Sequence, residues 1–256
     1  MRQIIAAFIF FTRLPFWRLA TIPAAYFARI LPYWPLTGWL TSGCSVLVLS
    51  VASLLLPYSV ALLFAIIARL LITGCLHEDG LADFFDGFGG GASRERILAI
   101  MKDSHIGVYG ATGLLLYFAL FYALLNQLPV ELASAALLAG DPFAKGISSM
   151  VVNRLPYARS QAEAKSGVVF AKMSVRDYAV CFIFTLLPLA GLPGAQYLLA
   201  TLAPVTGWYF LTALMKKKIQ GYTGDCCGAL FLLCEACFYL SILLIYSSSF
   251  FITSEG

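Results

Sequence analysis

The sequence predicts an all-α fold: a polytopic integral-membrane bundle of about seven transmembrane helices, with one further helix at the amino terminus. Composition is the main reason, since 61% of the 256 residues are hydrophobic and only 12% are charged. The mean hydropathy of +0.86 agrees. Soluble domains have about 45–50% apolar residues. We therefore expect a single integral-membrane domain over residues 1–256.

The first element is expected at the amino terminus, where an apolar run follows Arg2. This beginning is similar to a signal peptide. It lacks a small-residue cleavage site, however, and the basic stretch "TRLPFWR" at 12–18 follows at once. We expect a retained helix that lies at the membrane interface, rather than a cleaved or fully inserted segment.

The remaining elements are apolar runs, which can cross a membrane when they supply about 20 residues of helix. The predicted spans are residues 34–56, 58–76, 107–127, 132–151, 178–193, 196–214 and 227–247. The fifth span is short and contains Pro188. We expect it to be interrupted there, because proline removes a helical hydrogen bond.

Lysine and arginine lie almost entirely in segments that this count places on one side of the membrane. These segments are residues 1–32, 94–102, 153–177 and 216–218, whereas the turns "LPYS", "NQLPVE" and "GLPGAQ" contain no basic residue. Short cytoplasmic loops carry such an excess. We therefore expect the amino terminus in the cytoplasm and the carboxyl terminus outside. Topology and anionic lipid account for the net charge of +4, so nucleic-acid binding is not expected.

The stretch "HEDGLADFFDGFGGG" at 77–91 concentrates acid in this apolar chain. On a helix, Asp79, Asp83 and Asp86 are spaced i, i+4 and i+7 and share one face, where like charges repel. A divalent cation such as Mg²⁺ relieves that repulsion, because it takes oxygen ligands and commonly combines carboxylates with substrate phosphate. The alternative is an ordinary solvated helix. The following glycines should end the helix and let the backbone approach a ligand.

The next stretch, "RERILAIMKDSHIGVYG" at 94–110, adds groups that suit phosphate chemistry. Its cations can meet phosphate, although Arg94 and Arg96 fit a solvated loop equally well. Asp103 and His105 are available as acid or base groups. Acids for a metal and cations for phosphate, together in one segment, are typical of phosphoryl transfer.

Other charges lie within or beside the predicted spans. Asp141 and Lys145 are at i and i+4, which predicts a structural ion pair. Arg69 precedes the acidic stretch and either neutralises it or extends to the membrane surface. Glu235 has no partner nearby in the sequence. In "GYTGDCCGA" at 221–229, Asp225 is either a helix cap or a part of the active site.

Four stretches, "TRLP", "HEDGLADFFDGF", "RERILAIMKDSHIGVYG" and "GYTGDCCGA", together resemble the cobalamin synthase family, which are adenosylcobinamide-GDP ribazoletransferases. The resemblance spans most of the chain, although the 153–177 loop and the tail depart from it. It implies a Mg²⁺-dependent multi-pass enzyme of the bacterial or archaeal cytoplasmic (inner) membrane, with its active site facing the cytoplasm. Such an enzyme transfers adenosylcobinamide phosphate from adenosylcobinamide-GDP to alpha-ribazole or its 5'-phosphate and releases GMP in cobalamin biosynthesis.

The resemblance also implies roles for individual residues. Metal binding falls to Glu78, Asp79, Asp83 and Asp86, with Asp79 and Asp83 as direct ligands. Because four acids exceed what one Mg²⁺ takes from protein, one acid is the general base or a second metal binds. Lys102 neutralises diphosphate, whereas Asp103, Ser104 and His105 position the nucleophile or leaving group, and Asp225 completes the site. Partners consistent with the family are the lipid bilayer, a second copy of the chain and other cobalamin-pathway enzymes.

Two other functions compete with this interpretation. CDP-alcohol phosphotransferases also hold metal on helical aspartates, but "DGLAD" at 79–83 does not meet their DGxxAR signature. An ion-coupled transporter accounts for Asp141, Lys145 and Glu235, yet it leaves the acids beside "KDS" unexplained. The soluble product separates the three functions, since the first releases GMP, the second CMP and the transporter neither.

Overall fold

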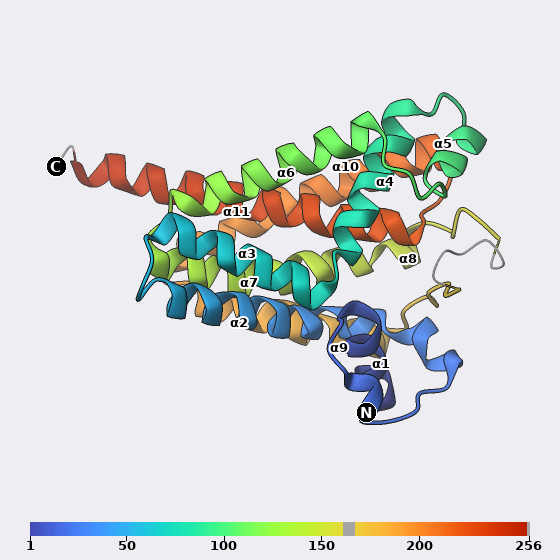
Figure 1. Cartoon of the computed structure of the whole chain (residues 1–256), viewed down its shortest axis with the longest axis horizontal. Coiled ribbons are helices and arrows are strands. Elements are labelled where there is room, and N and C mark those ends of the chain that lie inside the picture. Colours follow the sequence, from blue (N-terminus) through green and yellow to red (C-terminus); the bar gives the residue numbers. More distant parts are fainter. Residues whose placement is uncertain (161–166, 255–256) are drawn as a thin grey trace.

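The computed structural model describes residues 1–160 and 167–254, and within these ranges the chain forms helices and no extended strand. The predicted all-α class is confirmed. Each of the seven predicted spans contains a helix that runs along the long axis of the molecule (Figure 1). These helices are α2 (Trp34–Ala52), α3 (Tyr58–Thr73), α6 (Val108–Asn126), α7 (Val130–Ser149), α9 (Val175–Leu186), α10 (Leu202–Ile219) and α11 (Gly224–Ser254). Lys165, in the predicted basic loop, lies outside the described residues.

Fewer than seven of these helices are long and apolar enough to cross a membrane. In the described part of the chain, four qualify: Leu31–Ala52, Val108–Asn126, Ala195–Ile219 and Gly224–Ser248. The bent pair of α3 and α4 (Leu76–Gly90) makes a fifth if it counts as one span. Charged Asp141 and Lys145 lower the hydropathy of α7, and α9 gives way at Leu187 to the 3-10 helix η5 (Leu187–Gly191), which contains Pro188. The chain is a multi-pass membrane bundle, and the count of seven is not confirmed.

The other α-helices of the described residues gather at one end of the bundle (Figure 1). These are α1 (Arg2–Phe11), α4, α5 (Arg94–Ile100) and α8 (Val151–Arg154). The carboxyl terminus lies at the opposite end. This arrangement matches the predicted grouping of the basic segments, while the side of the membrane that they face stays a prediction.

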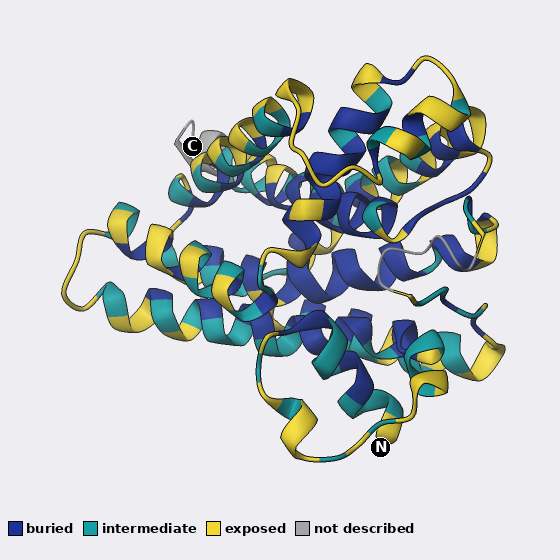
Figure 2. Cartoon of the chain, turned by 45° about the vertical axis from the view of Figure 1, so that its right-hand side comes forward, coloured by how far each residue is buried: buried dark blue, intermediate teal, exposed yellow. Residues whose placement is uncertain are grey.

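Burial separates the inner helices from the outer ones (Figure 2). Along α11, residues such as Leu230, Phe231 and Phe238 are fully buried. Large apolar side chains on outer surfaces are exposed instead, for example Leu71 at 72% and Leu115 at 73%. Exposed apolar surface of this extent is rare on soluble monomers, so it is the surface that would meet lipid.

A sharp turn directs α4 away from the bundle axis. Gly74 and Cys75 both have left-handed backbones, with φ of 63° and 57°. Together they bend the chain by 90° between α3 and α4. Glycine suits the first position because it adopts positive φ without strain, and a Cβ there would also meet the Arg13 side chain. The second predicted span therefore ends at Thr73, not at residue 76.

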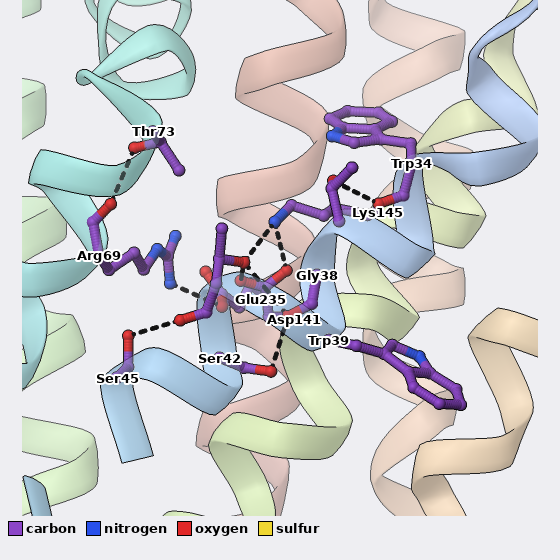
Figure 3. Close-up of polar contacts among 12 residues, drawn as sticks. Trp34, Gly38, Trp39, Ser42, Ser45, Arg69, Thr73, Asp141, Lys145 and Glu235 are labelled. Atoms are coloured by element: carbon purple, nitrogen blue, oxygen red, sulfur yellow. Dashed lines mark hydrogen bonds and ion pairs between the residues drawn. The ribbon is translucent and has the colours of Figure 1, made fainter. Parts of the chain in front are cut away.

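A network of buried charges crosses the centre of the bundle, here called the central network (Figure 3). The predicted pair of Asp141 and Lys145 is confirmed as an ion pair, with 2.6 Å between Oδ1 and Nζ and both side chains 1% exposed. Thr41 on α2 joins the two, because its hydroxyl donates to Asp141 Oδ2 at 2.7 Å and accepts from Lys145 Nζ at 2.9 Å. The pair thereby ties α7 to α2.

The second part of the central network supplies the partner that Glu235 lacks in the sequence. Arg69 on α3 donates to Glu235 Oε1 at 2.7 Å, and the Tyr239 hydroxyl donates to the same oxygen at 2.7 Å. Arg69 also lies over the rings of Phe121 and Phe231, 5.1 and 5.2 Å from their centroids. Instead of extending to the membrane surface, Arg69 is held inside the bundle.

Candidate active site

The acidic stretch and "GYTGDCCGA" meet where α4 crosses α11. A Cβ on Gly80 would lie 2.9 Å from the carbonyl oxygen of Asp225, and a Cβ on Gly228 would lie 3.0 Å from that of His77. The two backbones can approach this closely only because both positions lack a side chain. The crossing brings two motifs that are far apart in the sequence to one place.

Three carboxylates of α4 line a hollow of about 290 Å³, here called the acid hollow. It contains Glu78, Asp79 and Asp83 together with Ser104 and His105 from the segment between α5 and α6. Glu78 and Asp83 are buried, whereas Asp79 is exposed. No lysine or arginine of the described residues lines this hollow. The structure therefore brings together five of the nine predicted site residues.

One carboxylate oxygen of Glu78, which lines this hollow, has no hydrogen-bond partner among the described residues. Its Oε1 lies 4.0 Å from Arg69 Nη2, but Arg69 makes its short ion pair with Glu235. Its Oε2 is buried without a hydrogen-bond partner in residues 1–160 and 167–254. A buried carboxylate is costly unless it is paired, so this oxygen is suited to receive a cation.

Asp86 has a different environment from the other three acids. Its Oδ2 accepts from the Gly107 amide at 2.7 Å and its Oδ1 from the Gly110 amide at 2.8 Å. These amides belong to the beginning of α6, where helices leave backbone donors without an intrahelical partner. Both oxygens of Asp86 thus hold α6 in place, and Asp86 is absent from the described lining of the acid hollow.

Asp103 orients His105 at the edge of the acid hollow. Asp103 Oδ1 lies 2.6 Å from His105 Nδ1 and accepts from the His105 amide at 3.0 Å. A carboxylate at Nδ1 fixes the tautomer and turns Nε2 outward, as in other acid–base pairs. Both side chains are mostly exposed, at 58% and 90%, which leaves the imidazole accessible to a substrate.

A second hollow of about 250 Å³, here called the aromatic hollow, shares Asp79 with the first. It also contains Asp225 and Arg159, whose Oδ2 and Nη1 lie 3.8 Å apart. Thr223 has the geometry of a helix cap, because its hydroxyl accepts from the Cys226 amide at 3.3 Å. Thr223 therefore occupies the capping position that was one alternative for Asp225, and Asp225 lines the hollow.

The predicted cations lie around a third hollow of about 510 Å³, here called the basic hollow. It is lined by Arg94, Lys102 and Arg159, so Lys102 is separate from the acid hollow. Arg94 donates to the carbonyl oxygens of Ile219 at 3.0 Å and Ala158 at 2.7 Å. Arg94 therefore ties α5 to neighbouring segments, whereas Lys102 is exposed.

Sequence reasoning missed Arg159 and Tyr157, both in the 153–177 loop. Residues 156–158 pair with Tyr222, since the Ala158 amide donates to the Tyr222 carbonyl at 2.8 Å and the Tyr222 amide to that of Pro156 at 3.0 Å. This places Tyr157 and Arg159 beside Asp225. Burial raises the pKa of Tyr157, so its phenol stays a hydrogen-bond donor. One arginine in a basic loop has no local signature that would have revealed it.

Comparison with known proteins agrees with the resemblance. The model of the family described as Cobalamin-5-phosphate synthase matches residues 3–243. The chain is 37% identical to the adenosylcobinamide-GDP ribazoletransferase of Shewanella frigidimarina, over 96% of each chain. It is 34% identical to those of Polaromonas sp., over 94% of this chain and 96% of the relative, and Leptospira interrogans, over 95% of each chain. No solved structure matches. The chain belongs to the cobalamin-5-phosphate synthase family.

Proposed function

We propose that this chain is an adenosylcobinamide-GDP ribazoletransferase of the bacterial cytoplasmic membrane. It transfers adenosylcobinamide phosphate from its GDP-activated form to alpha-ribazole or alpha-ribazole 5'-phosphate and releases GMP. The observation that carries the proposal is Asp79, which lines the acid hollow with Ser104 and His105 and the aromatic hollow with Asp225. All the family-like motifs that carry acid or base groups thus meet at one end of the bundle. The activity for which the relatives are named supports the same reaction.

Magnesium fits this site as a cation held jointly by protein and substrate. No cluster of three or more His, Cys, Asp or Glu side chains in the described residues is arranged to hold a metal by itself. Mg²⁺ commonly takes only one or two carboxylates and completes its shell with substrate phosphate and water. The unpartnered Oε2 of Glu78 fits this requirement, with Asp79 and Asp83 beside it. When bound, the ion would supply neutralisation of the diphosphate charge.

The chemistry left to the chain is positioning and proton transfer. A ribose hydroxyl attacks the phosphorus that bears the aminopropanol arm, the bond from this phosphorus to the bridging oxygen breaks, and GMP leaves. We assign the hydroxyl proton to His105 Nε2, because Asp103 holds the ring at Nδ1 and His105 lines the acid hollow. Lys102 and Arg159 line the basic hollow, where they can neutralise the phosphate of the leaving GMP.

The test is GMP release by the purified full-length chain, supplied with adenosylcobinamide-GDP, alpha-ribazole 5'-phosphate and Mg²⁺. We expect one GMP for each corrinoid product and no release when either substrate is omitted. Release of CMP from a CDP-alcohol would instead support the lipid phosphotransferase. Ion flux through vesicles without any nucleotide product would support the transporter.

A separate experiment tests the proposed orientation, with the site facing the cytoplasm. Cysteine substitutions near residues 95 and 218, in a variant from which the native cysteines have been removed, should react only with reagents that enter the cytoplasm. The turn near residue 127 should react from outside, because it contains no basic residue. Labelling of residue 95 from the outer side would reverse the orientation and place the substrates in the wrong compartment.

A further inference from the structure

The aromatic hollow has a wall of stacked rings that the chemistry above does not use. The wall is made by Phe10, Phe11, Trp34, His77, Tyr157 and Phe170. Phe11 and Trp34 lie nearly parallel, with centroids 5.0 Å apart and planes at 13°, and His77 continues the stack 5.7 Å from Trp34. Aromatic rings gain by stacking on other flat rings. A wall of this kind is therefore suited to a planar ligand.

Two members of this wall have ring nitrogens without a hydrogen-bond partner among the described residues. Trp34 Nε1 and both ring nitrogens of His77 are buried without a hydrogen-bond partner in the part of the chain that the structure describes. Trp34 is 1% exposed and His77 is 3% exposed. Buried polar groups are nearly always paired. The indole donates, and a neutral imidazole offers one donor and one acceptor, so the wall is complementary to a ring with few nitrogen atoms.

We propose that the aromatic hollow binds the base of the acceptor nucleoside, a flat and largely apolar nitrogen heterocycle of the benzimidazole type. The inference rests on the proposed function and assigns the acceptor, rather than the guanine of the donor, to this hollow. Guanine presents acceptors at O6 and N7 and a donor at N2, so it needs polar partners around much of its edge. Aromatic rings are instead the most numerous side chains of this lining, and two of its three charged members, Asp79 and Arg159, also line the neighbouring hollows.

The neighbouring hollows agree with this assignment. Asp79 lines both the aromatic and the acid hollow, and Arg159 lines both the aromatic and the basic hollow. A nucleoside with its base on the aromatic wall therefore has its ribose close to the acids and to the proposed proton acceptor. The GMP end of the donor diphosphate is left with the basic hollow, where Lys102 and Arg159 lie. Acceptor and donor meet where the hollows adjoin.

His77→Phe and Trp34→Phe test the inference, because each keeps a ring for stacking and removes the nitrogens. We expect the KM for alpha-ribazole to rise about tenfold or more, since a base nitrogen loses its partner. The KM for adenosylcobinamide-GDP and the inhibition constant of GMP should stay within about twofold. Trp17→Phe is the matched control, because Trp17 is 55% exposed and is not part of this wall; all three constants should be unchanged.

The opposite pattern would overturn the inference. If the KM for adenosylcobinamide-GDP or the inhibition constant of GMP rises while the KM for alpha-ribazole is unchanged, guanine occupies this hollow. The proposed function would then stay intact. If the unmodified chain releases no GMP when both substrates are supplied, the proposed function itself fails. Photolabelling of the unmodified chain with an azido-benzimidazole riboside does not depend on the folding of a variant. Label should appear on the peptides that contain Trp34 or His77, and label confined to other peptides contradicts the assignment.

Discussion

The central network and the acid hollow both contain carboxylates of the same apolar bundle, but these carboxylates differ in their partners. In the central network, Asp141 lies 2.6 Å from Lys145 and Glu235 lies 2.7 Å from Arg69. In the acid hollow, Glu78 has its closest cation 4.0 Å away and keeps one unpartnered oxygen within the described residues. No lysine or arginine of those residues lines this hollow.

This difference separates charges that hold the bundle together from a carboxylate oxygen, Glu78 Oε2, that is suited to a ligand. Charged groups inside a bilayer are tolerated when they pair with one another, and the central network satisfies that condition without any outside partner. In the acid hollow, Glu78 Oε2 is left without a hydrogen-bond partner among the described residues. A cation that arrives with the substrate is the compensation that we propose, and the following predictions test each side of the comparison.

The largest effect is expected when two acids of the hollow are changed together. Asp79→Asn with Asp83→Asn keeps side-chain shape but removes two charged oxygens, so GMP release should fall to background. Loss of groups that merely support a metal ligand costs about 10–100-fold, and direct ligands should cost more. Glu131→Gln is the control, because Glu131 is exposed at the beginning of α7 and should leave the rate unchanged. A double variant with a normal rate would contradict the proposed role of the hollow.

Next in size is the effect of breaking the ion pair of Arg69. Glu235→Gln leaves Arg69 buried without its short-range partner, which should cost about 3–5 kcal/mol of folding free energy. We expect a lower melting temperature and a lower yield in detergent. Glu78 lies on α4, which crosses the helix of Glu235. Glu78→Gln should leave the melting temperature unchanged and raise the Mg²⁺ requirement instead. If Glu235→Gln folded normally and were inactive, Glu235 would belong to the active site and not to the bundle.

Breaking the pair of Asp141 and Lys145 should also lower the yield of folded protein, and removing both charges should restore part of it. Asp141→Asn and Lys145→Met should each lower the yield of folded protein, because each leaves one buried charge unpaired. The double variant should recover part of the loss, which size-exclusion profiles in detergent can measure. Single variants that fold normally but lack turnover would move the pair to the catalytic residues.

Asp86→Asn should give the smallest effect. An asparagine keeps one acceptor oxygen for the beginning of α6 and loses the other, which should cost about 1–3 kcal/mol of stability. The Mg²⁺ dependence of the surviving activity should match that of the unmodified chain. A Mg²⁺ requirement raised as far as that expected for Glu78→Gln would return Asp86 to the metal ligands.

Local patterns were enough to predict a helix within each apolar run and the acidic helix, because apolar runs and i, i+4 spacing are properties of short segments. The same spacing predicted the Asp141–Lys145 pair, which the structure confirms. Spacing also placed Asp86 on one face with Asp79 and Asp83. It could not show that the beginning of α6 packs on that face and occupies both oxygens of Asp86.

Contacts between distant segments were beyond local patterns. Arg69 meets Glu235 across 166 positions of sequence, and Arg159 meets Asp225 only because residues 156–158 pair with Tyr222. Such contacts depend on how the helices cross, for example where Gly80 and Gly228 let α4 and α11 approach. The family-like motifs predicted what the site contains, whereas the crossing determines which of its residues meet.

The central claim is that the acid hollow, where Glu78 keeps one unpartnered oxygen among the described residues, serves a divalent cation. Mn²⁺ binding to the purified full-length chain, followed by electron paramagnetic resonance with adenosylcobinamide-GDP present and absent, tests it most directly. We expect binding that is tighter with the donor and that weakens by more than about tenfold in Glu78→Gln and in Asp79→Asn, while Glu131→Gln binds as the unmodified chain does. Equal Mn²⁺ affinity in all four proteins would contradict the claim.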